Sequence, residues 1–244
     1  MIEIRWDGPI ATIALARGSA RNALPISAWE DLAGRAAGLD AARVVILASD
    51  MPGIFSAGAD IGEFPQLQRD PEVRTRFRQA MRRGIDALAA LPVPVLAAID
   101  GGCFGAAVAL VLAADLRIAG EAAQFAVTPA RLGLGYPRED VDRLAAQVGG
   151  GQASALLFTG QPIDADAAER IGLVERRAPH AGDAAKAMAD QIAENAPGAV
   201  RLLKRALRSP GDATLDTAFE ASFGSAELAE GLAAFQARRP AVFS

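Results

Sequence analysis

Three short predicted strands constrain the fold of this chain more than any other feature. Two of them, Val44–Ala48 and Val95–Ile99, are continuous apolar runs, and the third, Leu116–Ala119, contains one charged residue, Arg117. Short continuous apolar runs of this kind are typical of buried strands. Segments with helical patterns lie between them, so strands and helices alternate along the chain. This alternation predicts an α/β fold in which crossover connections join the strands of a sheet.

Local signals predict the remaining elements. The segments Ile2–Arg5 and Ala11–Ala16 flank a Gly-Pro turn and predict a hairpin. Ser27, with Glu30 three residues later, predicts a capping box at the start of a helix that reaches about residue 37. Further helices are expected over Arg69–Leu91, Gly105–Ala114, Pro197–Arg208 and Ser225–Arg238, and from about Asp212 onward.

The chain changes composition near residues 185–197, and from about Asp140 its pattern is nearly all helical. We therefore expect a core over residues 1–190 and a C-terminal helical region over residues 191–244 that serves in oligomerisation or as a lid. The apolar residues of that region exceed what a small appendage buries alone, and packing against the core is the alternative. They are Val200, Leu202, Leu203, Leu207, Leu215, Phe219 and Phe223.

The composition argues against several kinds of partner and location. The net charge of −4 gives no reason to expect a nucleic acid or an anionic membrane as partner. The longest apolar stretch, Phe104–Ala114, is too short to span a bilayer, and the N-terminus lacks the features of a signal peptide. The single cysteine, Cys103, rules out an internal disulfide framework and fits a reducing compartment. These features predict a cytoplasmic protein.

A loop of small residues, Phe55–Ile61, follows the first apolar run. Small residues let the backbone turn tightly and come close to a ligand. Such a turn can aim its N–H groups at a developing oxyanion, although most loops of this kind are only turns. A second glycine-rich segment, Gly101–Ala107, follows the run Val95–Ile99 and opens a helix.

These segments and several others resemble the enoyl-CoA hydratase/isomerase (crotonase) family. The segment Phe55–Asp60 is similar to the family's FSAGAD motif, and Pro94–Gly101 is similar to its PVIAAVNG strand and turn. Further similar segments are Gly102–Ala107, Asp115–Ala119, Leu157–Gly160 with Ile163–Ala165, Ile171–Val174, Glu230–Phe235 and Arg239–Pro240. They occur in the family's order and cover nearly the whole chain, so the resemblance is specific.

The resemblance implies a crotonase-like spiral of ββα turns with a C-terminal helical region, assembled as a trimer or a pair of trimers. It also implies an acyl-CoA substrate, with coenzyme A as part of that substrate and no other cofactor. The backbone N–H groups of Ala59 and Ala106 would bind the thioester oxygen. The residues that would contact the substrate nearby are Ala57, Asp60, Ile61 and Gly105. A turn residue that bonds to its own loop is the alternative for Asp60.

The chain departs from the family at the two glutamates that hydratases use. These carboxylates activate water and protonate the α-carbon. Ala109 stands at the first position, and Pro129 stands at the second. Because neither residue transfers protons, the simple hydratase mechanism loses both of its acid–base groups.

The segment Thr128–Tyr136 resembles the family's methylmalonyl-CoA decarboxylase branch, although that branch has a histidine where this chain has Ala59. Thr128 and Tyr136 would orient a carboxylate there, and Tyr136 can relay a proton; a packing role is the alternative for this single tyrosine. Glu139, with Asp140 beside it, is a candidate acid on the same loop; the alternative is a solvated charge at a helix start.

Three functions stay open from the sequence. The first is an acyl-CoA enzyme that uses the oxyanion hole without the two glutamates, for example as a 2-carboxyacyl-CoA decarboxylase. The second is a hydratase or isomerase with relocated acid–base groups such as Glu139. The third is a non-catalytic acyl-CoA-binding protein. No cluster of histidine, cysteine and carboxylate residues has metal-ligand spacing. We expect His180 to have no catalytic role and Cys103 to face the core.

Overall fold

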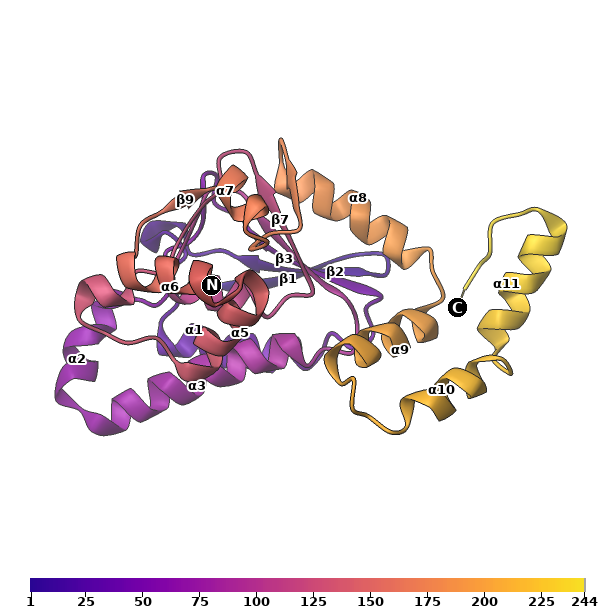
Figure 1. Ribbon diagram of the computed structural model, residues 1–244, viewed down its shortest axis with the longest axis horizontal. Helices are drawn as coiled ribbons and strands as arrows, with labels where there is room; N and C mark the ends of the chain where they lie inside the picture. The colour runs from indigo at the N-terminus through magenta and orange to yellow at the C-terminus, as the bar shows by residue number, and fades with distance from the viewer. Residues whose placement is uncertain (244) are drawn as a thin grey trace.

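The computed structural model describes residues 1–243, which form two sheets and the helices around them (Figure 1). The six-stranded sheet has the order β1 (Ile2–Asp7), β2 (Ile10–Leu15), β3 (Val44–Ser49), β5 (Val95–Ile99), β7 (Leu116–Gly120) and β10 (Arg176–Ala178). The four-stranded sheet has the order β4 (Ile54–Ser56), β6 (Gly102–Phe104), β8 (Gln124–Ala126) and β9 (Ile163–Asp164). Only β1 with β2 and β8 with β9 pair antiparallel within these described sheets.

Helices fill the connections between the strands and form the C-terminal end of the described chain. The α-helices are α1 (Ile26–Ala36), α2 (Phe64–Arg69), α3 (Pro71–Ala89), α4 (Ala106–Val111), α5 (Arg138–Val148), α6 (Gly150–Thr159), α7 (Ala165–Arg170), α8 (Ala181–Ala193), α9 (Pro197–Arg208), α10 (Leu215–Ser222) and α11 (Ala226–Ala237). Short 3₁₀ helices occur at η1 (Gly18–Ala20), η2 (Ile61–Glu63) and η3 (Pro129–Leu132).

The chain repeats a ββα unit three times. Strands β3 and β4 precede α2 and α3, strands β5 and β6 precede α4, and strands β7 and β8 precede α5. The first strand of each unit joins the six-stranded sheet, and the second strand joins the four-stranded sheet. This arrangement confirms the expected α/β fold and its spiral of ββα turns.

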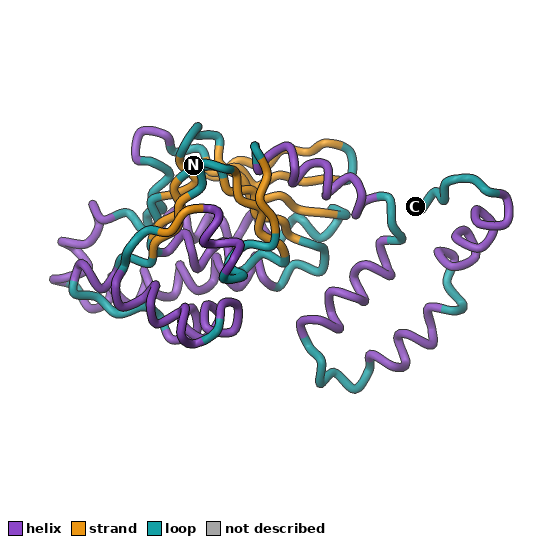
Figure 2. The backbone as a smooth tube through the Cα atoms, turned by 45° about the horizontal axis from the view of Figure 1, so that its top comes forward, coloured by secondary structure: helices purple, strands orange, loops and turns teal. Residues whose placement is uncertain are grey.

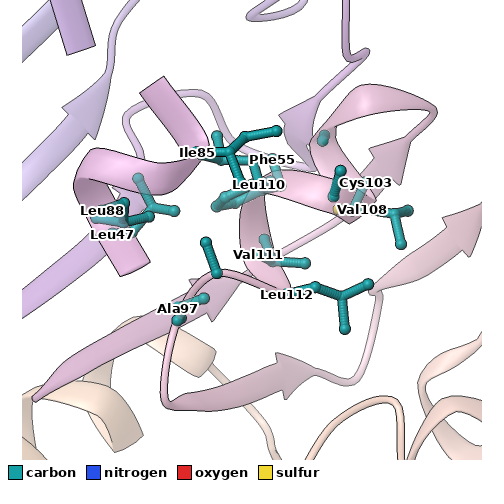
Figure 3. Close-up of a cluster of buried hydrophobic side chains, with 14 of the residues drawn as sticks. Leu47, Phe55, Ile85, Leu88, Ala97, Cys103, Val108, Leu110, Val111 and Leu112 are labelled. Atoms are coloured by element: carbon teal, nitrogen blue, oxygen red, sulfur yellow. The ribbon is translucent and has the colours of Figure 1, made fainter. Parts of the chain in front are cut away.

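Helix α4 lies at the centre of the apolar core, and each of its residues is buried. Figure 3 shows Val108, Leu110 and Val111 of this helix together with Phe55 of β4 and Ile85 of α3. Helix α4 also contacts β6 and α5, so its position is fixed from more than one side. The alanine-rich α8 packs against the six-stranded sheet in a second, smaller core.

The predicted hairpin is confirmed by the pairing of β1 with β2, but the predicted capping box is wrong. Helix α1 begins at Ile26, and no side chain of its N-cap residue accepts a bond. Instead the Ile26 N–H donates to Oε2 of Glu63, at 2.9 Å, from the distant η2 segment. Glu30 accepts two bonds from Arg76 of α3, at 2.9 and 2.8 Å. A residue far away in sequence therefore accepts from the start of α1, and Glu30 pairs with Arg76 instead of capping the helix.

The helix expected over Arg69–Leu91 is interrupted at Asp70. Asp70 is extended, with φ of −119° and ψ of 109°, and its carboxylate accepts bonds from the first backbone N–H groups of α3. A residue before proline disfavours helical backbone, and Pro71 follows directly. The helix expected over Gly105–Ala114 is also shorter, because α4 ends at Val111.

The C-terminal helices α9, α10 and α11 extend away from the two sheets in both ribbon and tube views (Figures 1 and 2). Helix α10 begins at Leu215 rather than near Asp212, whereas the helix expected over Ser225–Arg238 is α11, whose N-cap is Ser225. Large apolar side chains on these helices are exposed. They include Leu203, Leu207, Phe219, Phe223, Leu232 and Phe235.

Candidate active site

The loop that leaves β4 lies against the turn between β6 and α4. A Cβ atom added to Gly58 would lie 2.4 Å from the carbonyl oxygen of Phe104 and 2.8 Å from the nitrogen of Ala106. Gly58 also has a φ of +88°, where a side chain is strained. The two segments therefore approach this closely only because residue 58 is glycine.

These two segments line a cavity of about 260 Å³, together with α2, α3, η3 and the segment before α5. The lining residues are Ala57, Ala59, Ile61, Phe64, Phe77, Met81, Gly105, Ala106, Thr128, Pro129, Leu132, Leu134, Gly135, Tyr136 and Pro137. Among them Tyr136 is the sole titratable residue. A neighbouring cavity of about 640 Å³ shares several of the apolar residues, so an apolar surface continues beyond the first cavity.

The lining residues whose backbone N–H groups have no acceptor among residues 1–243 include Ala59 and Ala106. Leu24 pairs with Ala59 in a parallel bridge, where the Leu24 N–H donates to Gly58 and the Asp60 N–H donates to Leu24. This pattern leaves the Ala59 N–H on the opposite side of its strand. The Ala106 N–H is the first of α4, where no intrahelical acceptor exists. Backbone donors are rarely left unpaired, so we expect each of these groups to pair with water or with a ligand.

Tyr136 lies in the lining, but its hydroxyl is already occupied by the backbone of α4. The hydroxyl donates to the carbonyl oxygen of Gly105 at 3.0 Å and accepts from the N–H of Ala109 at 3.1 Å. Burial, with a smaller contribution from the Asp140 carboxylate, raises the pKa of Tyr136 well above its ordinary value. The hydroxyl therefore stays protonated, and its one proton points at Gly105.

Three other sequence-predicted positions of this region, Thr128, Ala109 and Pro129, differ in the polar groups that they present to the cavity. Thr128 lines the cavity, and its hydroxyl has no hydrogen-bond partner in the part of the chain that the structure describes. Ala109 is buried within α4, and Pro129 lines the cavity at the start of η3. Neither position supplies a proton-transferring group.

Glu139 and Asp140 lie outside the residues that line the cavity. Glu139 is in the first turn of α5, with 53% of its side chain exposed. A hydrogen bond from its own backbone N–H lowers the pKa of Glu139. Asp140 is fully buried and accepts from Nη1 of Arg82 at 2.8 Å. Burial raises the pKa of Asp140, and the bond from Arg82 opposes that effect.

Asp60 anchors the small-residue loop and is not part of the cavity lining. Its Oδ2 accepts from Nη1 of Arg17 at 2.6 Å, and its Oδ1 accepts from the Gly62 N–H at 2.9 Å. The Arg17 bond, followed by the Gly62 bond, lowers the pKa of Asp60. The alternative of a turn residue describes these contacts, whereas Ala57, Ile61 and Gly105 do line the cavity.

Sequence reasoning missed part of the lining and the partner of Asp60. Phe77 and Met81 of α3 lie four residues apart, a spacing that marks one face of a helix but not what that face contacts. Phe64 of α2 packs edge-on against Phe77 with ring centroids 6.3 Å apart. Nothing in the local sequence around Arg17 identifies it as the partner of a carboxylate 43 residues later.

Cys103 is a free, buried cysteine, and burial raises the pKa of its thiol. The expectation of a core-facing side chain is thus confirmed. His180 precedes the first turn of α8, outside the cavity lining. Residues 1–243 contain no group of three metal-ligating side chains, and none of their helices is long and apolar enough to cross a membrane.

Two sheets joined by repeated ββα units, with glycine turns facing a cavity, define a protein of the crotonase fold. The chain belongs to the enoyl-CoA hydratase/isomerase family, whose model matches residues 6–244. Human enoyl-CoA hydratase domain-containing protein 2, mitochondrial, is 33% identical over 97% of this chain and 86% of its own length.

Solved structures show the same relationship. An enoyl-CoA hydratase/isomerase family protein from Hyphomonas neptunium is 35% identical, with a TM-score of 0.95 over 100% of this chain and 97% of its own. Enoyl-CoA hydratase from Bacillus anthracis is 31% identical, with a TM-score of 0.92 over 99% and 98% of the two chains. The chain is therefore an acyl-CoA enzyme of this family in fold and sequence.

Proposed function

We propose that the chain binds an acyl-CoA thioester in the cavity and stabilises its enolate with the N–H groups of Ala59 and Ala106. One observation supports this proposal: both N–H groups lack acceptors among residues 1–243, and both belong to residues that line one cavity. An enolate carries negative charge on the thioester oxygen, and fixed N–H donors stabilise such charge. Coenzyme A enters as part of the substrate, and the proposal needs no other cofactor.

A complex with a saturated acyl-CoA, which cannot be hydrated, tests this placement. We expect the thioester oxygen within hydrogen-bond distance of both N–H groups. The variant Ala59→Pro removes one donor and should lower turnover by about 10²–10³. A thioester bound elsewhere, or unchanged turnover in a folded Ala59→Pro protein, would overturn the assignment.

We further propose that hydration of crotonyl-CoA is slow. General acid–base groups contribute about 10²–10⁴ each to rate, and Ala109 and Pro129 supply none. The cavity lining also lacks a carboxylate, which supports this expectation. Fast hydration that survives both Glu139→Gln and Asp140→Asn would show that the acid–base groups lie elsewhere.

Decarboxylation of a 2-carboxyacyl-CoA suits a site with donors but no carboxylate. The bond between the α-carbon and the carboxylate breaks, CO₂ leaves, and the electron pair enters the thioester enolate. A proton from water then adds to the α-carbon. The Thr128 hydroxyl has no partner among the described residues and can donate to the carboxylate, whereas the Tyr136 hydroxyl already donates its hydrogen bond to the Gly105 carbonyl. We therefore favour Thr128 over Tyr136 for the orienting role.

The competing functions predict different products. A hydratase or isomerase with relocated groups such as Glu139 would add water to crotonyl-CoA or shift its double bond. A non-catalytic acyl-CoA-binding protein would bind both ligands without turnover. Incubation with crotonyl-CoA and with methylmalonyl-CoA, followed by mass spectrometry, separates water addition, loss of CO₂ and binding alone. Loss of CO₂ would support the decarboxylase.

We also propose that residues 191–244 mediate assembly into a trimer or a pair of trimers, or cover the site as a lid. The exposed apolar residues of α9, α10 and α11 support an interface in this region. The cytoplasmic location likewise remains our expectation, and the free, buried thiol of Cys103 agrees with it.

A further inference from the structure

The hydroxyl of Tyr136 is inserted into the first turn of α4. In a regular helix the Ala109 N–H would donate to the carbonyl of Gly105, four residues earlier. Here the Ala109 N–H donates to the tyrosine oxygen at 3.1 Å, and the tyrosine O–H donates to Gly105 at 3.0 Å. The Gly105 carbonyl also accepts from the Val108 N–H at 3.0 Å. The hydroxyl is thus the one side-chain donor to this carbonyl among the described residues.

The carbonyl that Tyr136 holds belongs to the same peptide unit as the Ala106 N–H. A peptide unit is planar, and none of the described peptide bonds is cis. In a trans peptide the C=O and N–H groups point in opposite directions. A donor that fixes the Gly105 carbonyl on the core side therefore aims the Ala106 N–H at the cavity.

Gly105 itself offers little resistance to rotation of this peptide unit. Its φ of 56° and ψ of −123° lie in a region open to glycine. Its N–H is fixed separately, by donation to the carbonyl of Ala126 at 2.8 Å. The orientation of the following peptide unit therefore depends on the two groups that hold the Gly105 carbonyl, the Val108 N–H and the Tyr136 hydroxyl.

We propose that Tyr136 is a positioning residue whose hydroxyl fixes and polarises the Gly105–Ala106 peptide, so that the Ala106 N–H is aimed at the thioester oxygen. The inference rests on the proposed role of Ala106. A hydrogen bond to the carbonyl also polarises the peptide and strengthens its N–H as a donor. Tyr136 acts through Ala106 and does not itself need to touch the substrate.

The sequence offers a selective way to observe this peptide. Glycine is followed by alanine at three places, Gly58–Ala59, Gly105–Ala106 and Gly198–Ala199. Protein labelled with carbonyl-¹³C glycine and ¹⁵N alanine gives one carbonyl-correlated amide signal for each pair. Two signals report the two proposed donors, and the third reports α9, away from the cavity lining.

The variant Tyr136→Phe keeps the ring and removes the hydroxyl. In the free protein we expect the Gly105–Ala106 signal to move, whereas the Gly58–Ala59 and Gly198–Ala199 signals keep their positions. With wild-type protein, butyryl-CoA should move the Ala59 and Ala106 signals. In the variant the movement of Ala106 should be reduced. Where a turnover substrate is known, kcat should fall about tenfold or more, up to the 10²–10³ of a lost donor, with KM nearly unchanged.

The outcomes separate the two proposals. If butyryl-CoA binds the wild type without moving either donor signal, the proposed function fails, and the free-protein comparison still measures what Tyr136 does. If the Gly105–Ala106 signal is the same in free wild type and free variant, the positioning role is overturned. If the variant does not fold, 3-fluorotyrosine at the chain's single tyrosine replaces it. An unmoved Gly105–Ala106 signal there would also overturn the proposal.

Discussion

At the scale of single residues, the site depends on where a few backbone groups point. Gly58 permits the close approach of two loops, and Gly105 turns the chain from β6 into α4. Asp60 then fixes the small-residue loop through Arg17. The Asp60 carboxylate accepts from the Gly62 backbone and from Arg17, which lies far away in sequence but close in space. Changing one of these groups should therefore change the stability of the loop.

The Asp60 carboxylate should make stability depend on acid pH. The Arg17 bond and the Gly62 bond lower the pKa of Asp60 in the folded state. A carboxyl whose pKa is lower in the folded than in the unfolded state stabilises the fold above its unfolded value, about 3.9, and loses that contribution as pH falls further. Asp60→Asn should therefore lower the free energy of unfolding at neutral pH and matter less below about pH 4.

Urea denaturation of both proteins from neutral to acid pH measures this difference. A gap between wild type and Asp60→Asn that stays constant down to the acid limit would contradict the linkage argument. The difference in unfolding free energy between wild type and Arg17→Gln should also shrink as pH falls, because the Arg17 bond is the main cause of the lowered pKa of Asp60.

At the scale of elements, the sequence predicted strands better than helix ends. The runs Val44–Ala48 and Val95–Ile99 match β3 and β5 because burial on both faces leaves an unbroken apolar signal. The sequence also located the loop Phe55–Ile61 and the turn at Gly105, because glycine residues mark places where the backbone turns tightly or comes close to another segment. The cap of α1 could not be predicted, because Glu63 reaches it only after folding.

In the site, too, features set by local sequence could be predicted, whereas contacts between distant residues could not. Ala59 and Ala106 both line one cavity, and their role as donors to a substrate stays a prediction. The hydroxyl contact of Tyr136 joins residues 31 positions apart and has no local signature. Glu139 follows Tyr136 closely in sequence, yet it faces solvent because α5 starts between the two residues.

The Asp70 side chain should contribute measurably to the free energy of unfolding, because it caps the N-terminus of α3. Its Oδ1 accepts from the N–H groups of Glu72 and Val73, at 2.8 and 3.3 Å. Loss of such a cap costs about 0.5–2 kcal/mol, so Asp70→Ala should lower the free energy of unfolding by that amount. Gln79→Ala, an exposed change on the same helix, should alter it by less than about 0.5 kcal/mol. Equal effects of the two changes in chemical denaturation would contradict the capping role.

At the scale of the whole molecule, the C-terminal helices leave apolar surface exposed. Phe219 and Phe223 of α10 pack edge-on, with ring centroids 5.3 Å apart, yet they are 59% and 66% exposed. Large contiguous apolar patches mark interaction surfaces, so this exposed pair is a candidate for the proposed interface. The site and this surface lie in different parts of the chain, so assembly and chemistry can be tested separately.

Sedimentation at micromolar concentration should show a trimer or a pair of trimers for the wild type. The double change Phe219→Ser with Phe223→Ser should shift the protein toward monomer, since it removes apolar contact area. Phe158→Ser, at an exposed phenylalanine of α6, serves as the control and should leave the assembly unchanged. A monomeric wild type would refute the proposed interface.

Both N–H groups that we propose as donors belong to alanines, and neither has an acceptor among residues 1–243. An alanine scan, the usual first survey of an unknown site, leaves these two positions untouched and returns no signal from them. Among the genetically encoded residues, only proline lacks the backbone N–H that would be lost. Most side-chain replacements there would change the size of the cavity while keeping the donors. Side-chain changes at these two positions can therefore alter which ligands fit the cavity while both N–H donors remain. Only a change that removes a backbone N–H will reveal what these donors contribute.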